Sequence, residues 1–406
     1  MKIIKSITAI LLALAILIPS ALLWSNMSFA RTSVHSLLSA LTSRQHRLAD
    51  GLSISAQEID KAASDYIGFH NSFINIYGLG MRLSGTRLVH AGARTLVKLD
   101  SGALVEYSTD PNAAKESADA AKKNVASLSA LKTYLDTQGI PLLFVLAPGK
   151  LDEEDPGLPY QLRDYSNVTA DSFLDGLESS GIDYLDLRKV WREKGWSRTD
   201  GFYYSDLHWQ PKYAILSWAY VTQYLSDRYG IRNDPSLFDL KNQKVESFKN
   251  ISLGSTGRII GRFYAIPDST ELYTPDFDTH FHLVNKRVGW DKTGTFEETT
   301  VNRSLTHDRS GLFTNDMINM YYARDSVVEN TLAPNDANVV FIRDSFGGML
   351  GGYVPLAFRN TSIVDMRTMN ERKDETVQSI IDNFDTDLVV VFYHIGMVDK
   401  EDMFSF

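Results

Sequence analysis

One serine of this sequence lies where a nucleophile of an α/β protein would lie. Residues 339–342 form an apolar run typical of a buried strand, and Arg343 and Asp344 lead from it into Ser345 and a Gly-containing helix start. Open α/β sheets bind their ligands at the carboxyl ends of parallel strands. The free N–H groups and the dipole of a helix start also favour a developing oxyanion. Ser345 is therefore a candidate nucleophile, and the alternative is a serine that only caps the helix.

An aspartate and a histidine could activate this serine. Asp206 and His208 lie two residues apart, ahead of a long amphipathic pattern that begins at Pro211. Imidazole can take the proton of a serine hydroxyl, and a neighbouring carboxylate orients the ring and stabilises the imidazolium. In an extended segment both side chains would face the same side. The alternative is a capping loop, with Asp206 as the cap and Trp209 as a core residue.

Other groups of side chains are weaker candidates for a functional site. Asp278, His280 and His282 alternate along a possible strand, and the two histidines could share a metal. No HExxH motif accompanies them and no third strong ligand can be named beside the histidines, so an exposed strand face is favoured. His394 is a weaker alternative base beside Tyr393. The sequence contains no cysteine, which excludes disulfides, thiolate zinc sites, iron–sulfur clusters and cysteine nucleophiles. We expect no metal and no cofactor.

The composition excludes some classes of partner. The 406 residues are 44% hydrophobic and 22% charged, as in an ordinary globular protein. Lys and Arg number 41 against 50 Asp and Glu, for a net charge of −9. A nucleic-acid-binding protein needs a basic stripe to neutralise phosphates, so we expect no nucleic-acid partner.

The elements that must position these residues follow an alternating pattern. Short apolar runs typical of buried strands occur at 140–147, 184–187, 339–342, 362–364 and 388–393. Helical patterns occur at 125–135, 211–229, 346–358 and 374–384. Strand alternating with helix indicates an α/β fold with a parallel sheet and helices on both faces. Residues 241–330 break this alternation, and we interpret them as a strand-rich insertion over one edge.

The N-terminus predicts a membrane anchor. Lys2 and Lys5 precede an apolar run over residues 7–24, which is long enough to span a bilayer and places the rest of the chain outside the cytoplasm. The alternative is a signal peptide that is cleaved after Ala30, which would give a secreted protein. We therefore divide the chain into an anchor or signal segment (1–30), a leader or stalk with a helix and a small hairpin (31–106), and an α/β domain (107–406).

These motifs together resemble a known family. Asp206-Leu207-His208-Trp209 ahead of a long helix, followed by a strand ending in Asp-Ser-Phe-Gly, is similar to the alginate O-acetyltransferase-like family of SGNH hydrolases, which includes the DHHW proteins. The order of the aspartate, the histidine and Ser345 along the chain is also that of the family. The family's Asp-His-His-Trp reads Asp-Leu-His-Trp here, and its Gly-Asp-Ser begins with Arg343. Residues 148–150 (Pro-Gly-Lys) match a Pro-x-Lys-like turn of the family.

The resemblance implies roles for individual residues. Ser345 would be the nucleophile, His208 the base and Asp206 the residue that orients it. The Ser345 backbone N–H would be the first oxyanion donor, and the sequence shows no second donor. Substrate contacts would come from three further residues, Arg367, Tyr393 and Lys150. For Arg367 and Tyr393 the alternatives are a surface ion pair and a packed aromatic ring.

The resemblance also implies a fold and a function. The fold would be SGNH-hydrolase-like, and the chain would transfer an acetyl group to or from hydroxyls of a cell-envelope polysaccharide or exopolysaccharide through an acyl-serine intermediate. Its partners would be that polysaccharide, the membrane and an acyl donor supplied by a membrane acyltransferase. Transferase and esterase remain open, because they differ only in whether a sugar or water accepts the acyl group. A non-catalytic glycan-binding or assembly module is the alternative.

Overall fold

The computed structural model describes residues 70–91, 94–108, 112–154, 156–303, 311–321, 325–369 and 375–406. The chain divides into two compact units, residues 1–80 and 81–406. The predicted anchor or signal segment, residues 1–30, lies outside the described residues, as does most of the leader. Within the described ranges, no helix combines the length and the apolar character that a membrane span requires.

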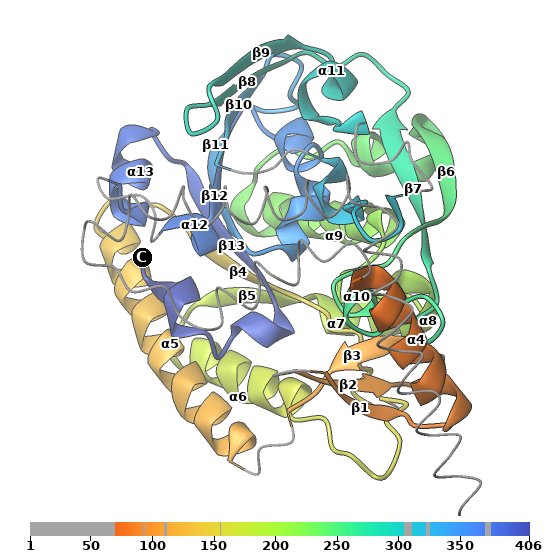
Figure 1. Ribbon diagram of the computed structural model, residues 1–406. Helices are drawn as coiled ribbons and strands as arrows, with labels where there is room; N and C mark the ends of the chain where they lie inside the picture. The colour runs from red at the N-terminus through yellow and green to blue at the C-terminus, as the bar shows by residue number, and fades with distance from the viewer. Residues whose placement is uncertain are drawn as a thin grey trace, which may run out of the picture. The chain divides into compact units, whose positions relative to one another are not determined.

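An eight-stranded sheet forms the centre of the second unit, with the strand order β5-β4-β13-β11-β12-β10-β8-β9 (Figure 1). The strands are β4 (Leu142–Ala147), β5 (Asp183–Asp186), β8 (Phe281–Asn285), β9 (Trp290–Gly294), β10 (Val327–Asn330), β11 (Asn338–Arg343), β12 (Asn360–Asp365) and β13 (Leu388–His394). The first five strands in this order are parallel, as predicted. The other three are antiparallel, so the expectation of a wholly parallel sheet is corrected.

The antiparallel strands come from the segment that was interpreted as an insertion over one edge. Instead of lying over the edge, β10 pairs with β12 and extends the central sheet. Only four residues separate β8 from β9, and a connection of that length permits a hairpin but no parallel crossover. The same segment also contains β6 (Gln243–Ser252) and β7 (Asp268–Pro275), which form a separate two-stranded sheet.

Helices cover both faces of the central sheet. The helices α5 (Ala113–Asp136), α6 (Ser166–Ser179) and α13 (Val377–Asn383) contribute to one hydrophobic core, and α7 (Leu187–Glu193) and α9 (Pro211–Tyr229) contribute to the other. Alternate side chains of β4 enter the two cores: Leu142, Phe144 and Leu146 the first, and Leu143, Val145 and Ala147 the second. A strand buried on both faces explains why the sequence shows a continuous apolar run there.

The predicted helices agree with the structure to different degrees. α9 has the predicted bounds, because Pro211 occupies its first turn and Gly230 ends it with a φ of 70°. The single helix expected over 346–358 is instead two short 3-10 helices, η6 (Phe346–Leu350) and η7 (Val354–Ala357). Glycines at 351 and 352 lie between them, and glycine disfavours a continuous helix.

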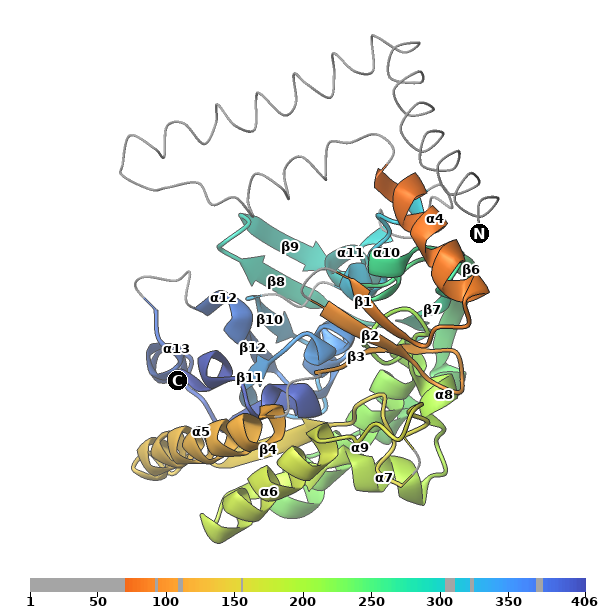
Figure 2. The same cartoon turned by 60° about the horizontal axis from the view of Figure 1, so that its bottom comes forward.

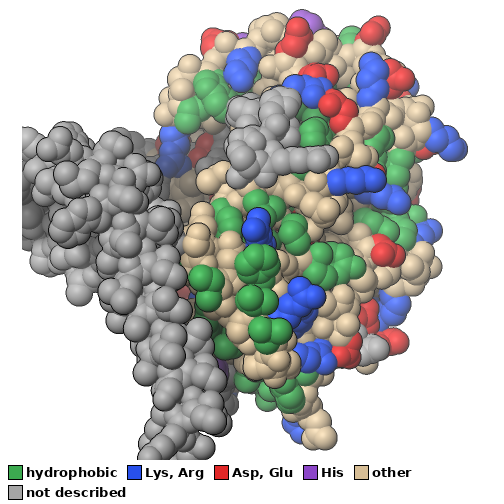
Figure 3. Space-filling model, turned by 45° about the vertical axis from the view of Figure 1, so that its right-hand side comes forward, with side chains coloured by type: hydrophobic (Ala, Val, Ile, Leu, Met, Phe, Trp, Pro, Cys, Tyr) green, Lys and Arg blue, Asp and Glu red, His purple; other side chains and the backbone are tan. Residues whose placement is uncertain are grey.

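Smaller elements complete the described chain. The segment predicted to form a small hairpin contains three antiparallel strands, β1 (Leu88–Ala91), β2 (Arg94–Lys98) and β3 (Leu104–Glu106) (Figure 2). The other helices are α4 (His70–Leu83), α8 (Arg198–Gly201), α10 (Gly257–Ile260), α11 (Phe296–Thr300), α12 (Met366–Met369), η1 (Pro235–Phe238), η2 (Leu240–Asn242), η5 (Met317–Met320), η8 (Ile395–Met397) and η9 (Glu401–Phe404). On the face of the second unit shown in Figure 3, acidic and basic side chains are interspersed.

The sheet brings several candidate residues to one edge. β4, β13, β11 and β12 are adjacent and parallel, so their carboxyl ends meet there. Lys150, His394, Ser345 and Arg367 lie at or just beyond these four ends, in that order. Open α/β sheets bind their ligands at these carboxyl ends of the strands.

Candidate active site

Ser345 lies in the turn that joins β11 to η6. The preceding residue, Asp344, fixes this turn, because its carboxylate accepts the N–H groups of Phe346 and His394, both at 2.8 Å. The Ser345 hydroxyl makes no capping hydrogen bond, so the structure does not use it as the helix cap. Among the residues that the structure describes, neither the hydroxyl nor the backbone N–H of Ser345 has a hydrogen-bond partner. Both groups are therefore available to a substrate.

Asp206 and His208 form a buried pair in the loop before α9. His208 Nδ1 lies 2.5 Å from Asp206 Oδ1, which also accepts the His208 backbone N–H at 3.0 Å. The second oxygen, Asp206 Oδ2, accepts the Ser255 N–H at 2.7 Å. The segment is thus a turn closed by the aspartate, and the extended chain expected from the sequence is corrected.

The environment of Asp206 keeps its carboxylate ionised. Burial acts to raise its pKa, but the charge of His208 and the hydrogen bonds from His208 and Ser255 outweigh it, so the pKa lies well below its usual range. An ionised Asp206 holds the proton of the neutral imidazole on Nδ1 and leaves Nε2 as an acceptor. His208 Nε2 is buried and has no hydrogen-bond partner in the described part of the chain. His208 has the tautomer that a general base needs.

Aromatic contacts connect this pair with the serine turn. The ring centroids of His208 and Phe346 are 4.9 Å apart, and Trp209 Nε1 donates to the Phe346 carbonyl at 3.2 Å. His208 therefore packs against the residue that follows Ser345. No hydrogen bond joins His208 to Ser345 among the described contacts. Bonds between a nucleophile and its base often tighten only when substrate binds.

A second carboxylate, which the sequence did not indicate, supports the loop. Asp268 accepts the backbone N–H groups of Tyr204 and Ser205 and the Ser205 hydroxyl. Burial raises the pKa of Asp268 to about 6. A Cβ at Gly254 would lie 2.2 Å from the Asp206 Cβ, so only glycine fits there. Both supporting residues are far from the loop in sequence, and no motif connects them to it.

Lys150 also supports this loop. Its ammonium group donates to the backbone carbonyls of Asp206 and Leu104, and the residue is only 8% exposed. Burial lowers its pKa to about 8. The lysine therefore holds the backbone of Asp206, and it also forms part of the wall of a neighbouring pocket.

The other two predicted substrate contacts have partners within the protein. Arg367 binds Asp365 through Nε at 2.9 Å and Nη2 at 2.6 Å, which is the ion pair of the alternative interpretation. Tyr393 is fully buried and its hydroxyl donates to the Met403 carbonyl at 2.5 Å, so it is the packed aromatic ring. Arg343 is buried as well, and its Nη1 lies 3.0 Å from Asp365 Oδ2.

A pocket of about 450 Å³ adjoins the base loop. Leu207, which lies between Asp206 and His208, forms part of its wall, and so does His394. Tyr107 and Tyr165 also line it, and aromatic rings of this kind can pack on sugars and acyl groups. The pocket has room for part of a small substrate.

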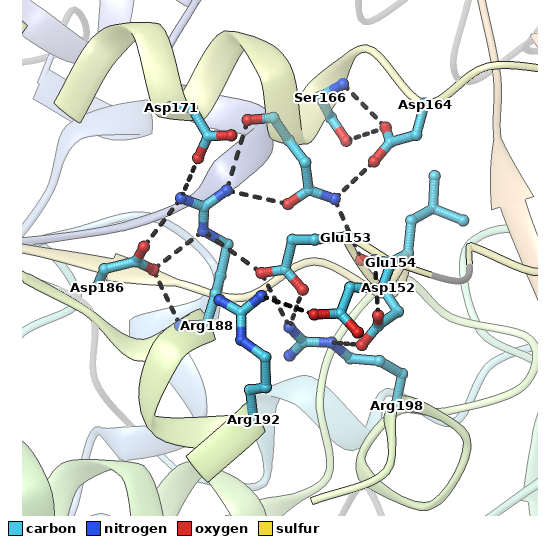
Figure 4. Close-up of polar contacts among 12 residues, drawn as sticks. Asp152, Glu153, Glu154, Asp164, Ser166, Asp171, Asp186, Arg188, Arg192 and Arg198 are labelled. Atoms are coloured by element: carbon cyan, nitrogen blue, oxygen red, sulfur yellow. Dashed lines mark hydrogen bonds and ion pairs between the residues drawn. The ribbon is translucent and has the colours of Figure 1, made fainter. Parts of the chain in front are cut away.

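Two other polar clusters are structural. Arg188 forms a bidentate pair with Asp186 at 3.0 and 2.9 Å and binds Asp171 at 2.7 Å, which connects β5 to α6 (Figure 4). His282 pairs with Asp291 and His280 with Thr331, so the two alternating histidines have separate partners. No group of three or more His, Asp or Glu side chains in the described ranges could hold a metal ion.

Comparison with known proteins identifies the domain. Residues 107–303 match the family model described as SGNH hydrolase-like domain, acetyltransferase AlgX. The family resemblance is confirmed. The matched segment of this SGNH-like domain contains Asp206 and His208 and ends before Ser345. None of the curated proteins matches the sequence significantly.

Solved structures share the fold of the SGNH-like domain at low sequence identity. PatB1 from Bacillus cereus is 18% identical, with a TM-score of 0.61 over 77% of this chain and 99% of its own. A DHHW family protein from Eubacterium siraeum is 13% identical, with a TM-score of 0.54 over 78% of this chain and 95% of its own.

Proposed function

We propose that this protein is a serine-dependent O-acyltransferase that acts on hydroxyl groups of a cell-envelope polysaccharide or exopolysaccharide. The observation that carries the proposal is His208, a buried imidazole with an ionised orienting partner, an unpaired Nε2 and a ring packed beside the Ser345 turn. The match to an acetyltransferase family supports the acetyl group as the acyl group and a polysaccharide as its acceptor.

The reaction would proceed in two balanced steps. Ser345 Oγ attacks the acyl carbonyl carbon while His208 Nε2 takes its proton, and the carbonyl oxygen becomes an oxyanion beside the Ser345 N–H. When the oxyanion collapses, the bond to the leaving oxygen breaks and that oxygen takes the proton from His208. A sugar hydroxyl then attacks acyl-Ser345 by the same steps in reverse, which regenerates the serine. If water attacks instead, the protein is an esterase.

The location and the acyl donor belong to the same proposal. The apolar run over residues 7–24 and the lysines before it support an anchored protein whose SGNH-like domain lies outside the cytoplasm. A membrane acyltransferase would then supply the acyl donor on that side. N-terminal sequencing of the protein from the membrane and the soluble fractions tests this, because a soluble product that begins at Arg31 would indicate secretion.

Acyl-enzyme trapping tests the catalytic step. We expect the wild-type protein to be acylated at Ser345 by para-nitrophenyl acetate and sulfonylated there by an aryl sulfonyl fluoride, with mass spectrometry locating each adduct. A second structure of Bacillus cereus PatB1 carries a sulfonyl adduct, which makes this probe suitable. Ser345→Ala should lose both adducts, and Ser179→Ala, at the exposed end of α6, should keep them.

Two results would change the assignment. Equal turnover by the wild type and Ser345→Ala would remove Ser345 as the nucleophile. Binding of polysaccharide with no acylation of the wild type would favour the glycan-binding module.

A further inference from the structure

His394 contacts both neighbours of Ser345 in the chain. Its backbone N–H donates to Asp344 Oδ2 at 2.8 Å. Its ring stacks on Phe346, with centroids 4.1 Å apart and planes inclined by 19°. His394 ends β13, the strand that pairs with β11 on one side and β4 on the other. It is therefore fixed beside the serine turn by a hydrogen bond and by a ring contact.

The hydrogen bonding of His394 determines where its proton lies. Nδ1 accepts the Gly396 N–H at 3.0 Å, so this nitrogen carries no proton and the neutral ring carries its proton on Nε2. Burial, together with the nearby charge of His208, lowers the pKa of His394 to about 3. The ring is thus neutral in the working pH range and presents an N–H donor, which argues against the alternative in which it acts as the base.

His394 Nε2 lies close to Gly149, and both residues line the pocket beside the base loop. His394 lines the 450 Å³ pocket together with Leu207 of the base loop. Gly149, after β4, also lines it, and a Cβ there would lie 3.6 Å from His394 Nε2 and 2.4 Å from Ile395 Cδ1. The glycine leaves the space beside the donor open.

We propose that His394 Nε2–H is the second oxyanion donor, acting with the Ser345 backbone N–H on the carbonyl oxygen of the acyl group. This inference rests on the proposed function. When Ser345 Oγ bonds to the carbonyl carbon and His208 takes its proton, the carbonyl electron pair moves onto oxygen, and that oxygen accepts hydrogen bonds from both N–H groups. The pair returns when the leaving oxygen departs, so His394 neither gains nor loses a proton. A neutral histidine suits this role because it donates without exchanging protons with the base.

Two substitutions separate a donor from a structural residue. His394→Asn retains an acceptor for the Gly396 N–H, as in an Asx turn, but lacks a donor at the position of Nε2. His394→Gln places an amide donor near that position and lacks the acceptor. The donor role predicts that kcat for para-nitrophenyl acetate falls about 100-fold in His394→Asn with KM little changed, and clearly less in His394→Gln. If His394 only supports the turn, kcat should instead fall more in His394→Gln, because that variant lacks the acceptor for the Gly396 N–H.

The controls make each outcome decisive. The exposed His280→Asn should leave kcat unchanged, and the melting temperature of every variant shows whether it is folded. In His394→Asn the dependence of kcat/KM on pH should keep its shape, because the base is untouched. Suppose that acyl-Ser345 forms in the wild type, but His394→Asn retains its kcat or His394→Gln is the poorer enzyme. His394 is then not the donor, and the proposed function still stands. A wild type that forms no acyl-Ser345 overturns both.

Discussion

Replacing Asp206 by asparagine tests the orientation of the base most directly. The substitution keeps the shape of the side chain and changes its hydrogen bonding. In the wild type the Asp206 carboxylate accepts three N–H groups: those of His208 Nδ1, the His208 backbone and the Ser255 backbone. An asparagine offers one oxygen and one NH₂ group in their place. The two orientations of the amide lose different hydrogen bonds.

With its oxygen toward His208, the asparagine NH₂ faces the Ser255 N–H, and two buried donors lose their acceptor at a cost of about 1–3 kcal/mol each. With its NH₂ toward His208, it donates to Nδ1, which moves the imidazole proton to Nε2 and removes the base. General base catalysis contributes about 10²- to 10⁴-fold. The first orientation leaves two donors without an acceptor and the second leaves only the His208 backbone N–H, so the second should prevail. We therefore expect kcat for Asp206→Asn to fall by about 10²- to 10⁴-fold, which is about 3–5 kcal/mol in the barrier.

The assay is para-nitrophenyl acetate turnover with thermal unfolding of the same samples. Asp239→Asn is a matched control, because Asp239 also accepts the N–H two residues ahead, at 3.0 Å, but has no histidine partner. We expect the control to keep its kcat and its melting temperature. If Asp206→Asn is folded and retains kcat within about threefold, the tautomer argument is refuted.

Two further predictions concern stability. Arg343→Met removes one partner of a buried ion pair and leaves Asp365 with Arg367 alone, so the free energy of unfolding should fall by about 3 kcal/mol in urea titration, and no change would contradict the pairing. Because burial raises the folded-state pKa of Asp268 from 3.8 to about 6, its contribution to stability is present at low pH and is lost as pH rises through this window. The wild type should therefore lose on the order of 3 kcal/mol relative to Asp268→Asn between pH ~4 and pH ~7, and a constant difference in unfolding free energy would contradict the raised pKa.

Sequence patterns predicted the parallel part of the sheet because burial on both faces leaves a local signal. β4 and β13 appear in the sequence as unbroken apolar runs, and α9 carries its own start and stop residues. The pairing of β10 with β12 left no such signal, because it depends on contacts between distant segments. Two-sided burial also hides which face a side chain takes, so Tyr393 was placed at the crevice when it points into the core.

The candidate site was predictable to the extent that its chemistry is local. Asp206 and His208 lie two residues apart, so one loop fixes their geometry, and the sequence shows the pair. Asp268 and Gly254 act on that loop through long-range backbone contacts. Gly254 is required because a Cβ there would overlap the Asp206 Cβ, and no local sequence motif indicates such a requirement. Sequence reasoning thus identified the candidate pair and missed the residues that hold its loop.

Three carboxylates pair with the backbone around the candidate site, while two buried polar atoms beside it, His208 Nε2 and Ser255 Oγ, have no hydrogen-bond partner among the described residues. Asp344 ties the ends of β11 and β13 together, and Asp206 and Asp268 satisfy the base loop. An unpaired buried acceptor such as His208 Nε2 costs about 1–3 kcal/mol, and a fold without a use for it could replace the ring by an apolar side chain. In the proposed reaction His208 Nε2 must stay free to take a proton. An unpaired Nε2 on a ring held by Asp206, beside a serine whose hydroxyl caps no helix, favours a catalyst over a module that only holds glycan.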